Sequence, residues 1–294
     1  MEDSNRRAVT FYKTLIVATL AALVLFPWGL SITALSKVAR LQTQLETVLS
    51  KPEPPTNAVA GLPEQSPLDN LDHPPLIQPD PGSPTKVAYL TFDDGPSQNT
   101  EAVLEILQQY GIKATFFVIG RSDSHSRQIY RKILQDGHSL GIHSYSHDYG
   151  RIYSSVDACM ADIGRLNELL FTSTGQIPTL YRFPGGSSNS IASLSLLSQV
   201  AYRLAEQDIQ YFDWNVDSGD ASAYDLPGEQ IIRNVVSGVK DKQHAIILLH
   251  DSAAKAGTVK ALPQIIESLL EQGFIFDRLT KETEPVQHRA FALT

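Results

Sequence analysis

The chain has 294 residues, of which 42% are hydrophobic and 19% are charged, a composition typical of a globular protein. Its formal net charge is -8 and it has no run of Lys and Arg, which argues against a nucleic-acid partner because phosphates need a basic surface. The single cysteine, Cys159, excludes an internal disulfide, and we expect it to be a buried apolar residue within a helix.

The first predicted element is a membrane anchor at residues 14–36. This stretch lacks charged residues and is rich in Leu, Ile, Val and Ala, so as a helix it can cross a hydrocarbon core of about 30 Å. Arg6 and Lys13 precede it, a bias that favours a cytoplasmic N-terminus at residues 1–13 with the rest of the chain outside. We therefore expect a single-pass protein of the cell membrane whose main domain is extracytoplasmic.

A cleavable signal peptide is the alternative interpretation of this segment. Ala34-Leu35-Ser36 would serve as a small-x-small cleavage site, and cleavage would make the protein secreted. The apolar run is longer than the ~7–15 residues usual in a signal peptide, which favours the uncleaved anchor. Both interpretations export the remainder of the chain.

Residues 37–85 are predicted to be a short helix followed by a proline-rich linker. Apolar residues recur with helical spacing between Val38 and Leu49, and ten of the seventeen prolines then fall between Pro52 and Pro84. Such a segment is semi-extended and can hold a domain away from the bilayer.

Beyond Lys86, short apolar runs alternate with amphipathic segments, which predicts strands alternating with helices. The seven expected strands lie near 86–92, 114–119, 139–142, 180–183, 210–216, 244–249 and 274–278. The expected helices lie near 99–110, 126–136, 156–171, 191–206, 228–239 and 257–272. This alternation predicts a parallel α/β sheet with right-handed crossovers, either open and doubly wound or closed as a barrel. In both architectures, functional side chains gather at the carboxyl ends of the strands.

Two adjacent carboxylates, Asp93 and Asp94, end the first predicted strand. Neighbouring residues on a strand point to opposite faces, so both carboxylates can serve one site only where the backbone bends. The following Gly95-Pro96 pair would supply that bend. The alternative interpretation of this segment is a solvated turn without a catalytic role.

Two histidines, His143 and His147, follow the third predicted strand. On a helical turn, residues four apart face the same side and can share one metal ion. Together with one aspartate from the first strand end, they form a set that binds zinc in hydrolases and leaves coordination positions open. The same set also suits non-haem iron oxygenases, in which an adjacent second aspartate has no obvious purpose.

A guanidinium leads into a glycine-rich turn after the fourth predicted strand, where Arg182 precedes Pro184, Gly185 and Gly186. Arg182 can hold a carboxylate by a bidentate fork. The backbone N–H of Gly185 can stabilise a developing oxyanion, because no side chain blocks its approach.

The fifth and sixth predicted strands also end in polar residues. Asp213, Asp217 and Asp220 lie within ten residues of one another, and one or two of them are candidates to cap the next helix. His250 ends a wholly apolar strand, a place where a histidine needs either a partner or a function.

At this point the chain resembles a known family, the polysaccharide deacetylases of carbohydrate esterase family four. The resemblance is greatest to bacterial peptidoglycan N-acetylglucosamine deacetylases tethered to the cell membrane, and it spans roughly residues 86–280. It implies a distorted (β/α)7 barrel. It is carried by five ordered motifs: Thr-Phe-Asp-Asp-Gly-Pro at 91–96, His-Ser-x-x-His at 143–147, Arg-x-Pro-Gly-Gly at 182–186, Asp-x-x-Asp at 217–220 and Leu-x-His at 248–250.

The resemblance also implies a role for each matching residue. Asp93 would be the general base and His250 the general acid, while Asp94, His143 and His147 would hold one divalent metal ion. We expect this ion to be Zn²⁺, with Co²⁺, Ni²⁺ and Mn²⁺ as alternatives. The remaining implied roles fall on Arg182, which orients the base, on Asp220, which tunes the acid, and on the oxyanion and substrate-binding residues Gly185, Pro184, Leu248 and Trp214.

One position departs from the family pattern. Many members have Trp directly after the second aspartate of the fourth motif, where this chain has Ala221. Trp214 and Tyr224 are the candidates to replace the groove wall that this Trp would build.

The expected function is metal-dependent hydrolysis of N-acetyl groups on a cell-wall polysaccharide, with N-acetylglucosamine of peptidoglycan as the substrate and acetate as a product. A chitin-oligosaccharide deacetylase or an O-acetyl esterase acting on xylan would use the same site. An inactive glycan-binding module is disfavoured because every base, ligand and acid position is filled. The expected catalytic domain covers 86–280 and is followed by a tail at 281–294, and the sequence indicates no oligomeric state.

Overall fold

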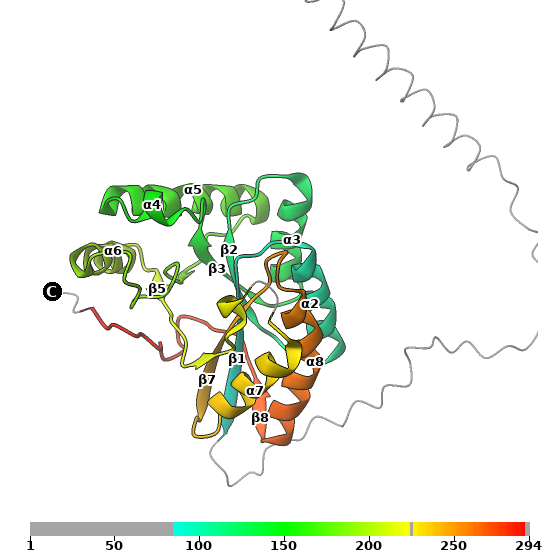
Figure 1. The fold of residues 1–294 in the computed structure, drawn as a ribbon. Coiled ribbons are helices and arrows are strands. Elements are labelled where there is room, and N and C mark those ends of the chain that lie inside the picture. Colours follow the sequence, from blue (N-terminus) through cyan, green and yellow to red (C-terminus); the bar gives the residue numbers. More distant parts are fainter. Residues whose placement is uncertain (1–84, 224–225, 292–294) are drawn as a thin grey trace, which may run out of the picture. The chain divides into compact units, whose positions relative to one another are not determined.

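A single parallel sheet of eight strands organises the computed structural model, which describes residues 85–223 and 226–291 (Figure 1). The strands are β1 (Lys86–Asp93), β2 (Thr115–Ile119), β3 (Ser139–Ser144), β4 (Leu180–Tyr181), β5 (Gln210–Tyr211), β6 (Val216–Asp217), β7 (His244–His250) and β8 (Phe274–Phe276). Their order is β5-β4-β3-β2-β1-β7-β6, and β8 pairs with β1 beside its first three residues. Every pairing is parallel, as the strand and helix alternation predicts.

Six helices connect these strands at the places that the hydrophobic periodicity predicts, with bounds that differ by a few residues, and two short helices, Tyr149–Ile152 and Asp220–Ser222, were not predicted. Five of the helices begin after a residue whose side chain accepts a hydrogen bond from the first turn, namely Ser97, Asp123, Asp148, Ser155 and Ser193. The helices are α2 (Gln98–Gln109), α3 (Ser124–Gln135), α4 (Tyr149–Ile152), α5 (Val156–Thr174), α6 (Leu194–Glu206), η1 (Asp220–Ser222), α7 (Gly228–Gly238) and α8 (Ala256–Glu271). Cys159 is buried within α5, as expected.

The predicted strand at 210–216 is two short strands that lie at opposite edges of the sheet. Phe212 N donates to Tyr181 O on one side at 2.9 Å, and Asn215 N donates to Ile246 O on the other side at 3.0 Å. The segment between them therefore crosses from the β4 edge to the β7 edge. This crossing gives the parallel sheet a half-barrel form, with eight strands among the described residues in place of the seven that we predicted.

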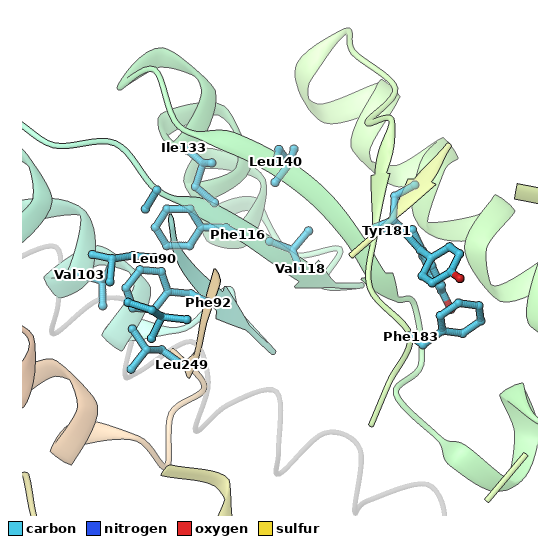
Figure 2. Close-up of a cluster of buried hydrophobic side chains, with 14 of the residues drawn as sticks. Leu90, Phe92, Val103, Phe116, Val118, Ile133, Leu140, Tyr181, Phe183 and Leu249 are labelled. Atoms are coloured by element: carbon cyan, nitrogen blue, oxygen red, sulfur yellow. The ribbon is translucent and has the colours of Figure 1, made fainter. Parts of the chain in front are cut away.

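Side chains of β1 alternate between two environments, as the period of a strand requires. Leu90 and Phe92 pack with the surrounding helices in the larger core, where Phe92 lies 5.2 Å from Phe116 between ring centroids (Figure 2). Tyr89 belongs instead to a smaller core on the inner face of the sheet. Asp93 follows Tyr89 at an interval of four residues, so its carboxylate also points to the inner face.

The inner face of the sheet combines this small core with the polar strand ends. Phe117 on β2, Ile246 on β7, Leu180 and Phe212 are buried in the small core. Two residues further along β7 from Ile246 comes Leu248, and two beyond that is His250, so the strand alternation carries the histidine to the same face. The small apolar core therefore packs beneath the site, toward the amino ends of the strands, while the polar groups of the site lie at the carboxyl ends of the strands.

Residues near the C-terminus pack against the domain, although we expected a tail from residue 281 onward. Asp213 N donates to Val286 O at 2.7 Å, and the Tyr211 hydroxyl donates to Arg289 O at 2.6 Å. His288 lies edge-on to Trp214, with 4.7 Å between ring centroids.

No helix among residues 85–223 and 226–291 is long and apolar enough to cross a membrane. The predicted anchor at 14–36, the short helix and the linker all lie outside the described residues.

Candidate active site

Asp93 and Arg182 form a buried ion pair at the carboxyl end of β1. Arg182 is fully buried, and its Nη1 donates to Asp93 Oδ1 at 2.9 Å and to Thr91 Oγ1 at 2.7 Å. Its Nε and Nη2 donate to the carbonyls of Phe212 and Asp213. The contact with Asp93 is thus a single hydrogen bond and not the bidentate fork that the sequence suggested, because the other donors hold the backbone of the crossing segment.

The charge on Asp93 is balanced between burial and this ion pair. Burial raises the pKa of Asp93 above its ordinary value, while the charges of Arg182 and His250 oppose the rise. Asp93 Oδ1 is occupied by Arg182, which leaves Oδ2 as the oxygen able to accept a proton. A carboxylate in this setting can act as a general base.

The bend that separates the two aspartates occurs at Asp94 itself, before the Gly95-Pro96 pair to which the sequence analysis attributed it. Asp94 has a φ of 74°, in the left-handed region that non-glycine residues rarely adopt. Its carboxylate is thereby turned toward the inner face, where Asp94 Oδ1 lies 3.1 Å from His147 Nε2 and 3.6 Å from His143 Nε2. Strain of this kind, about 1–3 kcal/mol, persists where the surrounding structure imposes it, commonly at functional sites.

Asp94, His143 and His147 bring one ligand atom each to within 4.8 Å of one another, and they fit a divalent metal ion. Asp94 Oδ1 is buried and accepts no hydrogen bond from any residue that the structure describes. A buried carboxylate oxygen without a donor is costly unless a cation compensates it. One carboxylate and two imidazoles are also a donor set that Zn²⁺ accepts.

The tautomer of His143 is determined by its surroundings. Its Nδ1 lies 2.8 Å from Arg182 O, and because a carbonyl only accepts, Nδ1 must carry the proton and Nε2 must present its lone pair. Burial lowers the pKa of His143 to about 3, so its imidazole is neutral, as a metal ligand must be.

His147 reaches the same point from a turn and not from a helix, in contrast to our prediction. His143 lies on β3, and His147 precedes α4 with a φ of 51°. The two rings lie 5.3 Å apart between centroids. The four-residue spacing therefore works through a left-handed turn.

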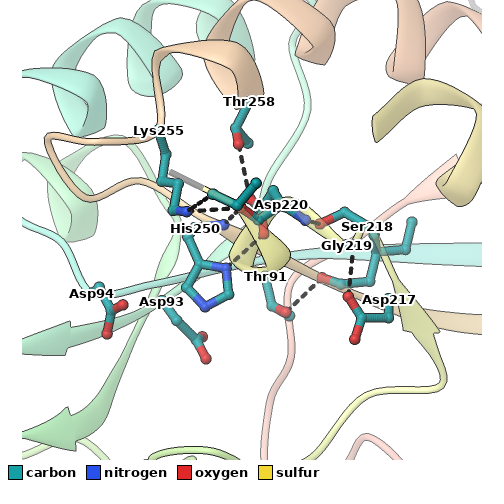
Figure 3. A network of polar contacts seen from close by, with 12 residues as sticks. Thr91, Asp93, Asp94, Asp217, Ser218, Gly219, Asp220, His250, Lys255 and Thr258 are labelled. Carbon is teal, nitrogen blue, oxygen red and sulfur yellow. Dashed lines mark hydrogen bonds and ion pairs between the residues drawn. The ribbon is translucent and has the colours of Figure 1, made fainter. Parts of the chain in front are cut away.

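At the carboxyl end of β7, Asp220 holds His250 (Figure 3). Asp220 Oδ1 lies 2.7 Å from His250 Nδ1, and its Oδ2 accepts from His250 N and from Thr258 Oγ1, each at 2.8 Å. Lys255 Nζ donates to Asp220 O at 2.7 Å. Asp220 is thus fixed at both carboxylate oxygens and at its carbonyl, and none of the predicted acids caps the following α7 helix.

These contacts set the charge of His250. Burial by itself lowers the pKa of His250, but the hydrogen bond and charge of Asp220, with the charges of Asp93 and Asp94, outweigh it and raise the pKa to about 9. Burial would raise the pKa of Asp220, but hydrogen bonds from His250 and Thr258 lower it below its ordinary value. His250 is therefore an imidazolium at neutral pH, with Nδ1–H on Asp220 and a second proton on Nε2.

A cavity of about 380 Å³ connects these groups. Its walls combine the two aspartates at the end of β1, the two ligand histidines and His250 with Gly185, Leu248 and Trp214. Ala221 and Lys255 also line the cavity, and Tyr149 adds an aromatic ring beside His147. Pro184 is buried and is not among the residues lining this cavity. Tyr224 lies outside the described residues.

Several residues that support the site lie outside the motifs that pointed to it. Asp213, one of the three acids considered as helix caps, is fully buried and accepts hydrogen bonds from Ser187 N at 2.8 Å and from His288 N at 2.7 Å. It thereby links the glycine-rich turn to the C-terminal segment. Thr258 and Lys255, which precede or begin α8, lie next to no recognisable motif, and only the tertiary contact with Asp220 reveals them.

Comparison with known proteins agrees with this geometry. The family described as polysaccharide deacetylase matches residues 80–205. A peptidoglycan-N-acetylglucosamine deacetylase from Bacillus cereus is 32% identical over 209 residues, which cover 69% of this chain and 72% of the relative.

Solved structures show the same relationship. The catalytic domain of a peptidoglycan N-acetylglucosamine deacetylase from Eubacterium rectale matches with a TM-score of 0.66 and 35% identity, covering 72% of this chain and 96% of that one. A carbohydrate esterase of family four from Streptococcus mutans matches with a TM-score of 0.60 and 30% identity, covering 67% and 87%. The chain therefore belongs to the polysaccharide deacetylase family, a group of carbohydrate esterases and deacetylases.

Proposed function

We propose that this protein is a metal-dependent deacetylase that hydrolyses the N-acetyl group of N-acetylglucosamine in peptidoglycan and releases acetate. The observation that carries the proposal is the convergence of three chemical groups on one cavity. A carboxylate base, a ligand set for a divalent ion and an imidazolium acid reach it from the ends of different strands. The likeness to peptidoglycan N-acetylglucosamine deacetylases supports the choice of substrate.

The residues of the chain divide the work of amide hydrolysis between them. Asp93 Oδ2 accepts the proton of the attacking water, while Arg182 on Oδ1 fixes the orientation of the carboxylate. The backbone N–H of Gly185 donates to the carbonyl oxygen as it gains negative charge. His250 Nε2 protonates the nitrogen that leaves, and Asp220 stabilises the imidazolium until that transfer.

The ligand set adds a second source of electrostatic stabilisation. A divalent ion bound by Asp94, His143 and His147 would lower the pKa of a bound water to about 7 and polarise the amide carbonyl. We propose Zn²⁺ as this ion because the set contains two imidazoles and one carboxylate. Asp93 stays outside the set, which leaves its carboxylate available as the base.

We further propose that the enzyme acts outside the cell and is held at the cell membrane by residues 14–36. The support is the uncharged apolar run and the positive charges before it. Alkaline extraction of membranes tests the anchor, and proteolysis of intact cells tests the orientation. The full-length chain should remain with the membranes and be degraded from outside, whereas a shortened chain in the medium would show cleavage.

The substrate is tested with the full-length chain, purified in mild detergent and loaded with Zn²⁺ or Co²⁺. Acetate is measured after incubation with purified peptidoglycan, chitin oligomers or acetylated xylan, and bound metal is measured in the same samples. Acetate from peptidoglycan is the expected result. Release only from acetylated xylan would make the protein an O-acetyl esterase, and release from none by a protein holding metal would overturn the deacetylase proposal.

A further inference from the structure

The turn that carries His147 has an unfavourable backbone conformation. His147 has a φ of 51°, and it is a metal-ligand candidate without the conformational freedom of glycine. A non-glycine residue in this region costs about 1–3 kcal/mol, so neighbouring contacts must hold it there. One such contact is a hydrogen bond three residues back along the chain, in which His147 N donates to Ser144 Oγ at 2.9 Å.

One carboxylate from α5 fastens this turn. Asp162 Oδ2 accepts from Ser144 Oγ at 2.7 Å and from Tyr145 N at 2.6 Å, and its Oδ1 accepts from Ser146 N at 3.0 Å. Three consecutive residues, from the last residue of β3 to Ser146, therefore donate to a single side chain. The same helix adds a second attachment, since the Arg165 guanidinium lies 3.8 Å from the centroid of the Tyr145 ring.

These bonds determine which way the Ser144 hydroxyl points. A hydroxyl has one proton, and that of Ser144 is donated in the hydrogen bond to Asp162. The lone pairs of Ser144 Oγ therefore remain free to accept from His147 N. Asp162 thus reaches His147 through Ser144. Asp162 itself is not part of the Asp94, His143 and His147 ligand set.

We propose that Asp162 is a positioning residue for the metal site, which holds His147 in its ligating conformation through the hydroxyl of Ser144. The inference deepens the proposed function, since it concerns the same ligand set. Residues that orient metal ligands typically contribute about 10- to 100-fold to metal affinity.

Asp162→Asn is the direct test. An amide has the shape of a carboxylate but only one acceptor oxygen, and its NH₂ group would face a donor of the turn. The Co²⁺ dissociation constant of the full-length chain, measured from the absorption spectrum of the bound ion, should rise by roughly 10- to 100-fold. Asp157→Asn is the matched control, because Asp157 lies exposed in the first turn of the same helix and should leave the constant unchanged.

Ser144→Ala tests the relay independently of Asp162. This variant should also weaken Co²⁺ binding, and Asp162→Asn combined with Ser144→Ala should be no weaker than the worse single variant, because both changes break one chain of contacts. Additive effects would overturn the relay. An unchanged dissociation constant in Asp162→Asn, with a lowered melting temperature of the metal-free protein, would show that Asp162 only stabilises the fold.

Metal binding is measured here without any glycan. A protein that gives the expected dissociation constants and releases no acetate from peptidoglycan would therefore contradict the proposed substrate and leave the role of Asp162 standing.

Discussion

Arg182 Nη1 lies 2.9 Å from Asp93 Oδ1, and neither residue has more than a few per cent of its surface exposed. The guanidinium also stacks on Phe117, with its central carbon 4.3 Å from the ring centroid. The base is thus oriented by a cation that is itself held by backbone carbonyls and an aromatic face. This arrangement makes Arg182 a structural as well as a functional residue.

We expect Arg182→Met to destabilise the protein and slow catalysis. Removing one partner of a buried ion pair leaves the other charge uncompensated, which costs about 3–5 kcal/mol. The pKa of Asp93 should rise further, because the charge of Arg182 lowers it. Urea unfolding measures the stability, and the acid limb of the pH profile of kcat/KM should move to higher pH.

Arg203→Met provides the comparison for Arg182. Arg203 is exposed on α6 and pairs with Glu206 at 3.8 Å. Loss of an exposed pair should change stability by less than ~1 kcal/mol. Equal effects of the two substitutions would contradict the role assigned to the buried pair.

Asp93 should respond to substitution differently from the metal ligands Asp94, His143 and His147. Asp93→Asn should lower kcat by about 10²- to 10⁴-fold, the usual contribution of a general base, while Zn²⁺ remains bound. His147→Ala should lose both metal and turnover, because it removes a ligand. Metal content by elemental analysis, measured beside acetate release, distinguishes the two. Loss of metal in Asp93→Asn would mean that the roles of Asp93 and Asp94 are reversed.

The activity should depend on pH through Asp93 and His250. His250 must be protonated to act as the acid, so kcat/KM should fall as pH rises through its pKa, which the structure raises to about 9. Asp93 must be ionised, so kcat/KM should also fall toward acid. Asp220→Asn should shift the alkaline limb to lower pH, because Asp220 raises the pKa of His250. An alkaline limb that stays in place would contradict the pairing.

The pair of Asp220 and His250 also stabilises the folded state, and this contribution depends on pH. A histidine whose pKa is raised on folding stabilises the folded state fully below its ordinary pKa of about 6.5 and loses that contribution as pH rises through the folded value. The free energy of unfolding should therefore fall between about pH 6.5 and the His250 pKa of about 9. Asp220→Asn should reduce this fall, and equilibrium unfolding at several pH values measures it.

Trp214 should contribute to glycan binding in the absence of a Trp at position 221. It lines the cavity together with Ala221, which is exposed and has no aromatic ring. Trp214→Ala should raise KM by roughly 2- to 10-fold, the equivalent of about 0.5–1.5 kcal/mol for an aromatic contact. Tyr202→Ala, which removes an exposed aromatic ring on α6 away from the cavity, should leave KM unchanged. Equal KM values for both variants and the unmodified enzyme would exclude Trp214 as a binding residue.

The sequence by itself determined the fold class and the identity of the central site. The alternation of strands and helices follows from hydrophobic periodicity, which is a local property, and the parallel sheet follows from that alternation. Polar residues at the ends of several strands were therefore expected to lie close together, because the carboxyl ends of parallel strands lie along one edge of the sheet. The sequence therefore predicts that Asp93, Asp94, His143 and His250 share one site, and the structure places them around one cavity.

Only the tertiary structure decided how these residues are held. The split of residues 210–216 into β5 and β6 depends on which sheet edge each half meets, and no local pattern encodes that choice. The left-handed backbone of His147 depends on Asp162, which approaches from α5. Arg182 likewise depends on tertiary packing, because the carbonyls of Phe212 and Asp213 to which it donates lie about thirty residues away in the sequence. Partners that are remote in the sequence become neighbours only through packing, whereas strand period and turn residues act on adjacent positions.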